Sequence, residues 1–244
     1  METVLGDVLI GWTDFPDNQL QRCEEHKKLE AKLMLTIPKN SSFLDIGCHY
    51  GDSICTMAIH AKNNNRGDIR FFAFDPHPKK CEHIRNIAQQ NDLNIKVYNH
   101  CVGDQDGTAS PDDCTLVDKE GVVIPSGVAS YKLNDSGSIV IKTIDEYEDI
   151  INPVGFMHVD TEGWEAAVLR GSHRVLKNPE NKMYLIAEYW SGYMAKKQLD
   201  RGRSHGVATA TPKDDILSVL NKYNIDRQPD IHIGDRNLFF KVNF

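Results

Sequence analysis

The chain has 244 residues, of which 40% are hydrophobic and 26% are charged, and its formal net charge is −7. A chain of this size can bury a full core without disulfides or a structural metal ion. An acidic surface repels phosphate backbones, so the composition disfavours nucleic acid as a partner.

The first hundred residues alternate between predicted helices and strands. Residues 23–35 have apolar positions at helical spacing before Pro38, and we expect residues 1–40 to form an N-terminal adapter segment. The segments that follow are a strand at 42–46, a helix at 52–61, a strand at 69–74, a helix at 79–91 and a strand at 95–98. This alternation predicts a parallel sheet with helices on both faces.

The alternation stops between residues 104 and 137, which are rich in Gly, Asp and Ser, and this stretch is predicted to be a β-rich insertion or lid. The later segments are strands at 138–142, 155–160 and 183–188, helices at 143–150, 165–176 and 212–223, and β-like runs at 224–228 and 237–242. We therefore predict one domain, 1–244, with a Rossmann-like α/β fold. Its doubly wound sheet is mostly parallel, with an antiparallel C-terminal strand.

The pattern Asp45-x-Gly47-x-x-x-Gly51 directly follows a predicted strand and precedes a helix, and Asp75 ends the next strand. Glycines let a ligand lie against the backbone, and a strand-terminal acid can accept both hydroxyls of a ribose. The pattern predicts a nucleoside-cofactor pocket. A nicotinamide-dependent oxidoreductase is the alternative, but it would need glycine where His49 stands. S-adenosylmethionine (SAM), which has no phosphate to bind, is favoured instead.

Residues 43–51, together with 141–147 and the block Asp160-Thr161-Glu162-Gly163-Trp164-Glu165, resemble the FkbM family of class I SAM-dependent methyltransferases. The sequence departs from the family's usual loop residues at Cys48 and His49. The resemblance implies that residues of the glycine loop and of the next two strand ends bind SAM. The expected cofactor-binding residues are Asp45, Gly47, His49, Tyr50, Gly51, Ser53, Asp75, Pro76, His77, Cys101, Val102 and Asp104.

Asp160 ends the strand expected beside the cofactor strand, and Glu162 follows it at the entry to a helix. In one hypothesis, Asp160 or His158 is a general base, and Glu162 helps to orient the acceptor. In another, Asp160 and Glu188 bind a divalent cation such as Mg²⁺ or Mn²⁺ through oxygen ligands. In a third, Glu162 and Glu165 only cap their helix, and His158 is a hydrogen-bonded core residue.

Acceptor recognition is expected from aromatic and charged residues near the later strand ends. The candidates are Trp164, Glu188, Tyr189, Trp190, Arg203 and His205. The alternatives are that Trp164 and Trp190 belong to the core, and that residues 201–205 form a solvated loop.

The resemblance implies a methyltransferase that acts on a hydroxyl of a sugar, a glycan or another polyhydroxylated small molecule. A SAM-binding module without catalysis is a further alternative. The six cysteines form no C-x-x-C pair, and no run approaches the roughly 20 apolar residues of a membrane span. We expect a cytoplasmic protein that binds neither nucleic acid nor membranes.

Overall fold

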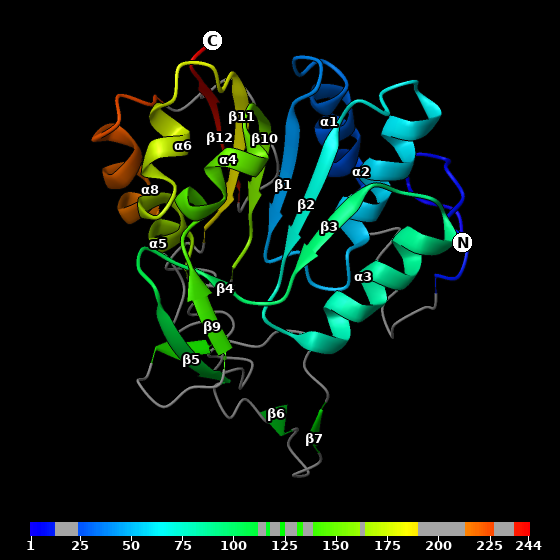
Figure 1. The fold of residues 1–244 in the computed structure, drawn as a ribbon, viewed down its shortest axis with the longest axis horizontal. Coiled ribbons are helices and arrows are strands. Elements are labelled where there is room, and N and C mark those ends of the chain that lie inside the picture. The colour runs from blue at the N-terminus through cyan, green and yellow to red at the C-terminus, as the bar shows by residue number, and fades with distance from the viewer. Residues whose placement is uncertain are drawn as a thin grey trace.

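A computed structural model describes residues 1–12, 24–111, 116–117, 123–124, 131–133, 139–161, 164–189, 213–226 and 237–244. Its main sheet has the strand order β12-β11-β10-β1-β2-β3 (Figure 1). The strands are β1 Ser42–Ile46, β2 Arg70–Phe74, β3 Ile95–Tyr98, β10 Val154–Val159, β11 Met183–Glu188 and β12 Asn237–Val242. All neighbours are parallel except β11 and β12, which confirms the predicted sheet.

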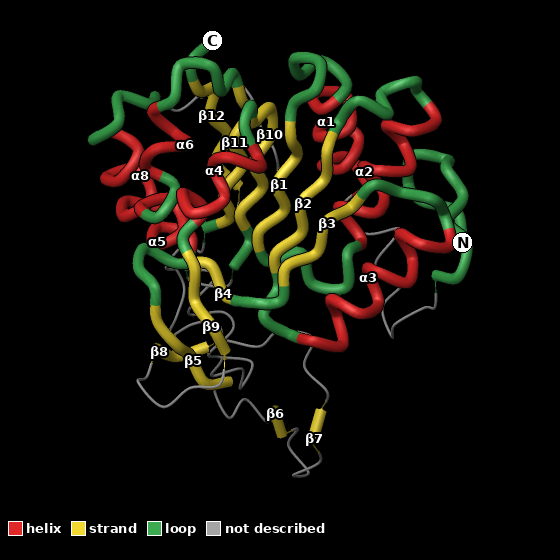
Figure 2. The backbone as a smooth tube through the Cα atoms, viewed as in Figure 1, coloured by secondary structure: helices red, strands yellow, loops and turns green. Residues whose placement is uncertain are grey.

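Helices cover both faces of this sheet, as the tube drawing also shows (Figure 2). One face is covered by α1 Glu24–Met34, α2 Asp52–Asn63 and α3 Pro78–Gln90. The other is covered by α4 Glu148–Ile151, α5 Glu165–Arg170, α6 His173–Lys177 and α8 Lys213–Asn221, and the 3-10 helix η2 Ile144–Tyr147 precedes α4. In the described ranges no helix is both long and apolar enough to cross a membrane.

Alternate residues of the central strands fill two cores. Phe43, Phe71 and Phe156 pack on the α1–α3 side, where the rings of Phe43 and Phe156 stack at 4.7 Å. Leu44 and Phe72 point into the core beneath α5, α6 and α8. Because side chains alternate between the two faces of a strand, both faces of β1 and β2 are buried. Both strands begin with a polar residue, Ser42 and Arg70, and the acids Asp45 and Asp75 lie at their carboxyl ends.

The predicted β-rich insertion is confirmed as a second, smaller sheet. It contains β4 Cys101–Val102, β9 Ile139–Lys142, β5 Gly107–Pro111 and β8 Tyr131–Leu133 in that order, with β6 Leu116–Val117 and β7 Val123–Ile124 paired separately. Figure 1 places β4, β5 and β9 beyond the carboxyl ends of β1, β2 and β3. The insertion thus lies at the edge of the sheet where ligands of such folds bind.

Two expectations need correction. The helix predicted at 165–176 is broken into α5 and α6 around Gly171, whose backbone lies against Gly103: a Cβ there would lie 1.9 Å from the Gly103 carbonyl oxygen. No strand forms over 224–226, the described part of the run predicted at 224–228. Within the segment predicted to be an adapter, Leu9 and Trp12 are buried in the core on the α1–α3 side.

Asn181 anchors the start of β10, the strand that leads to His158 and Asp160. Its fully buried side chain accepts a hydrogen bond from the Val154 N–H (2.8 Å) and donates to the Val175 carbonyl (2.8 Å). Asn181→Ala leaves both buried groups unpaired. We expect a loss of about 2–4 kcal/mol in the free energy of unfolding, measured by urea denaturation. The exposed Asn221→Ala is the control, and equal stability of the two variants would contradict this role.

Candidate functional site

The site lies where the chain order of the sheet reverses. β1 lies between β2 and β10, so the segment after β1 turns to one side and the segment after β10 to the other. Open α/β sheets bind ligands in the crevice outside the carboxyl ends of strands at such a point. Asp45, Asp75 and Asp160 all lie at this end of the sheet.

Two glycines of the loop after β1 have no room for a side chain. Gly47 has φ +86°, and a Cβ there would lie 1.8 Å from the Asp160 carbonyl oxygen. Gly51 has φ +87°, and its Cβ would lie 2.6 Å from Cγ1 of Ile84 in α3. The loop therefore passes directly against β10 and α3. Only glycine combines this backbone conformation with such close contact.

Asp75 joins this loop to the end of β2. The carboxylate is buried, and its two oxygens accept hydrogen bonds from the backbone N–H groups of His49 (3.0 Å) and His77 (2.8 Å). Burial raises the pKa of Asp75, while Lys80 and the two N–H donors oppose that rise. Each carboxylate oxygen can accept a second hydrogen bond, so a ligand with two adjacent hydroxyls could bind here.

His49 and Tyr50 occupy the middle of the loop. His49 has the left-handed φ of +53°, and its ring meets the Tyr50 ring edge-on at 4.8 Å. The ammonium of Lys80 lies 5.7 Å from the centre of the Tyr50 ring. The loop is thus packed against α3 by aromatic and cation–π contacts.

Asp45 and His158 are register partners on β1 and β10. His158 Nδ1 lies 3.0 Å from Oδ1 of Asp45, whose side chain is 1% exposed. Within the described part of the chain, Oδ2 of Asp45 has no hydrogen-bond partner. Burial disfavours the charged imidazole and lowers the pKa of His158. The nearby carboxylates of Glu30, Asp45 and Asp160 have the larger effect and raise this pKa to about 10. A histidine that is protonated at neutral pH cannot serve as a general base.

Asp160 directly follows β10, and Glu188 is the last residue of the neighbouring β11. The last register pair of these strands is Val159 with Ala187, and Glu188 is 7% exposed. Asp160 Oδ1 is buried and accepts no hydrogen bond from any described residue. No group of three or more His, Cys, Asp or Glu residues in the described ranges is placed to hold a metal ion, so we assign no metal ligand.

Other predicted cofactor residues have partners within the protein. The Ser53 hydroxyl donates to Glu30 (3.3 Å), and Asp104 forms an ion pair with Arg170 (2.8 Å). Cys101 and Val102 are buried in β4, where they follow the end of β3. Pro76 and His77 lead into α3, whose N-cap is His77.

Two of the predicted acceptor residues, Trp164 and Tyr189, pack in different clusters. Trp164 packs against the cluster of Cys101 and Ile141, whereas Tyr189 packs against the core below α8 and lies under Lys213. Glu165 is fully buried and accepts hydrogen bonds from the Thr161 N–H and hydroxyl. Thr161 precedes α5, whose N-cap Trp164 has no side-chain cap hydrogen bond, so capping by Glu165 stays a prediction. Glu162, Trp190, Arg203 and His205 lie outside the described residues.

Glu30 lies beside the site, although its place in the sequence does not indicate this. It is 2% exposed, contacts Ser53 and lies 3.9 Å from His158, yet it belongs to a charged helix with the sequence EEHKKLEAKLM. Nothing in that sequence separates Glu30 from the exposed Glu25. Its contacts come from the tertiary packing of α1.

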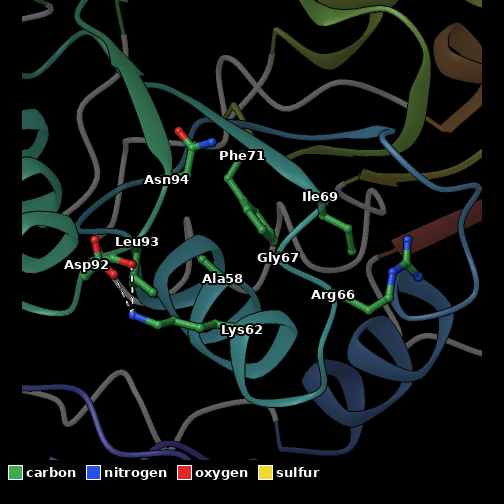
Figure 3. Close-up of a pocket in the computed structure, with 9 residues that line it drawn as sticks. All are labelled: Ala58, Lys62, Arg66, Gly67, Ile69, Phe71, Asp92, Leu93 and Asn94. Atoms are coloured by element: carbon green, nitrogen blue, oxygen red, sulfur yellow. Dashed lines mark hydrogen bonds and ion pairs between the residues drawn. The ribbon is translucent and has the colours of Figure 1, made fainter.

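A pocket of about 200 Å³ lies elsewhere, at the opposite end of β2 and β3 (Figure 3). Both cations that line it have hydrogen-bond partners. The Lys62 ammonium donates to Asp92 and to the Asn91 carbonyl. The Arg66 guanidinium donates to Asp68 and to the carbonyls of residues 35, 37 and 38. This pocket is remote from the carboxylates, and we assign it no chemistry.

Comparisons with known proteins show the family to which the chain belongs. Residues 45–201, more than half of the chain, match the Methyltransferase FkbM domain. The chain is similar to the methyltransferase FkbM from Methylobacillus flagellatus KT (15% identity, TM-score 0.48), with 93% of this chain and 55% of that one covered. A search of curated proteins found no match.

Two further solved structures are similar. A putative rRNA-methylase from Clostridium thermocellum has 10% identity and a TM-score of 0.50, with 88% of this chain and 94% of that chain covered. The Aeropyrum pernix fibrillarin, crystallised with S-adenosyl-L-methionine, has 13% identity and a TM-score of 0.49, with coverages of 98% and 86%. The fold is the predicted Rossmann-like fold of class I methyltransferases.

Gly47→Ala tests the close contact between the loop and β10. The new Cβ would meet the Asp160 carbonyl and require φ +86°, so we expect the free energy of unfolding to fall by at least about 2 kcal/mol in urea. Gly67→Ala is the matched control, because nothing lies within 4 Å of its Cβ position. Its stability should stay within about 1 kcal/mol of the parent. Equal effects of the two changes would refute the contact.

Proposed function

Because this chain belongs to the FkbM family of SAM-dependent methyltransferases, we propose that it methylates a hydroxyl of a sugar, a glycan or another polyhydroxylated small molecule. The main support is the group of carboxylates at the carboxyl ends of β1, β10 and β11. Asp160 and Glu188 each follow a member of the last register pair of β10 and β11, and Asp160 has a buried oxygen with no partner among the described residues. Carboxylates accept hydrogen bonds from hydroxyl groups, and one of them can also take the proton.

The residues around the glycine loop fit SAM. Asp75 has one remaining acceptor position on each oxygen for the two ribose hydroxyls. Gly47 lets the methionine portion lie against the backbone, and Asp45 Oδ2 is a buried acceptor suited to its ammonium group. The first turn of α2 has no side-chain cap, so its N–H groups suit the methionine carboxylate. Pro76, His77, Cys101 and Val102 would border the adenine.

When bound, SAM supplies an electrophilic methyl group on a sulfonium, and the hydroxyl oxygen displaces the sulfur in line. The C–S bond breaks as the O–C bond forms, and sulfur keeps the electron pair. The protein mainly positions the acceptor. Asp160 takes the hydroxyl proton. His158 is already protonated, and it therefore stabilises the surrounding carboxylates rather than acting as the base.

The acceptor would bind between the carboxylates and the smaller sheet. Trp164 lies against β4 and β9 through Cys101 and Ile141, at the entry to α5. A net charge of −7 favours an uncharged polyhydroxylated acceptor over nucleic acid.

The four cysteines in the described ranges are free thiols, which supports a reducing compartment such as the cytoplasm.

Asp75→Asn tests the ribose site. Loss of the charged acceptor should raise the Kd for SAM at least about tenfold, since hydrogen bonds to charged groups contribute about 1.5–3 kcal/mol. Calorimetric titration measures this effect, with the exposed Asp92→Asn as the control. Unchanged SAM affinity of Asp75→Asn would remove Asp75 from the site.

Asp160→Asn tests the chemistry. The amide cannot take a proton, so kcat should fall by about 100-fold or more while the Kd for SAM changes little. Transfer of a labelled methyl group to a panel of sugars, glycans, phenols and RNA provides the measurement, with the exposed Asp149→Asn as the control. Full activity of Asp160→Asn would refute its role as the base, and methylation of RNA alone would refute the proposed acceptor class.

A further inference from the structure

Glu30 is a buried carboxylate on α1, outside the matched residues 45–201. It is 2% exposed. Burial alone would raise its pKa, but His158, His26 and Lys27 outweigh burial and lower the pKa of Glu30 to about 2. A buried ion that costs several kcal/mol to desolvate needs close partners in the fold.

Those partners come from three elements. On α1 itself, His26 Nε2 lies 3.1 Å from Glu30 Oε1. From the first turn of α2, the Ser53 hydroxyl donates to Oε2 at 3.3 Å. From β10, His158 Nε2 lies 3.9 Å from Oε1. Glu30 is therefore the point at which α1, α2 and β10 meet.

The imidazole of His158 lies between two carboxylates. Its Nε2 faces Glu30, and its Nδ1 lies 3.0 Å from Oδ1 of Asp45. The hydrogen bond of Nδ1 orients the ring, and the charge of Glu30, at a distance longer than a hydrogen bond, favours the same orientation. That orientation occupies Oδ1 of Asp45 and leaves Oδ2 without a partner in the described part of the protein.

The same helix also holds the start of α2. Lys27 Nζ lies 2.8 Å from Oδ2 of Asp52, next to the bond between Ser53 and Glu30. Two adjacent residues of the first turn of α2 are thus attached to α1. This turn directly follows Gly51 of the cofactor loop.

We propose that Glu30 is a positioning residue of the donor site, which acts through His158 and Ser53 to hold the Asp45 carboxylate and the first turn of α2 against the methionine end of SAM. This inference rests on the proposed placement of SAM. It assigns to α1 a part of the donor site that lies outside the matched domain.

The test compares Glu30→Gln with Glu25→Gln, a matched change at an exposed carboxylate of the same helix. Calorimetry measures the Kd for S-adenosylhomocysteine and for 5′-methylthioadenosine, which keeps the nucleoside but lacks the amino-acid part. We expect Glu30→Gln to weaken S-adenosylhomocysteine about tenfold and to leave 5′-methylthioadenosine within about twofold. Glu25→Gln should bind both ligands as the parent does.

The two ligands separate positioning from general damage to the fold. Equal weakening of both ligands, or no weakening of either, would overturn the proposal. If Glu30→Gln does not fold, Ser53→Ala decides instead. A selective loss for S-adenosylhomocysteine would support the proposal, and unchanged binding would overturn it. A parent protein that binds neither S-adenosylhomocysteine nor SAM would instead refute the placement of the donor.

Discussion

The contact between the Gly47 backbone and the Asp160 carbonyl determines the form of the whole site. A side-chain carbon at residue 47 would stand 1.8 Å from that oxygen, so the loop after β1 and the end of β10 approach as closely as two backbones can. The register of β1 with β10 places Asp45 beside His158, and the approach at Gly47 brings the loop against Asp160 at the same edge of the sheet. The loop can then reach β2 as well, where the His49 N–H binds Asp75.

The second constraint is electrostatic. Several carboxylates lie at one buried edge, and each would be unstable there as an isolated ion. A protonated His158 between Glu30 and Asp45 offsets part of this repulsion, and the two backbone donors to Asp75 offset another part. Burial raises the pKa of Asp45 and of Asp75, and these partners oppose that rise. The charged groups also depend on one another, because the removal of one charge changes the electrostatic environment of the others.

The sheet and the cofactor loop could be predicted because their signals are local. Buried strands are short apolar runs, and the glycines of 45–51 follow one of them directly. Glu30 could not be predicted, because an acid in a charged helix looks the same whether it is buried or exposed. The contact of Gly171 with the distant Gly103, at the break between α5 and α6, is likewise a tertiary one. The family resemblance implies Ser53 and Asp104 as cofactor ligands, and the partners that they have here belong to α1 and α5.

The helix α1 and the first residues of the chain belong to the same core as the strands that bear the site. Leu9, Trp12 and Met34 pack with Phe43 and Phe156, although all three precede the matched domain. At the other end, β12 pairs with β11 along its whole length and also lies beyond the match. The part of the chain that matches the family is therefore shorter than the part that packs into the common core and sheet. A fragment cut at residues 45 and 201 would lose most of β1 and all of α1, which covers part of one face of the sheet. It would also lose β12 and leave β11 as an unpaired edge strand.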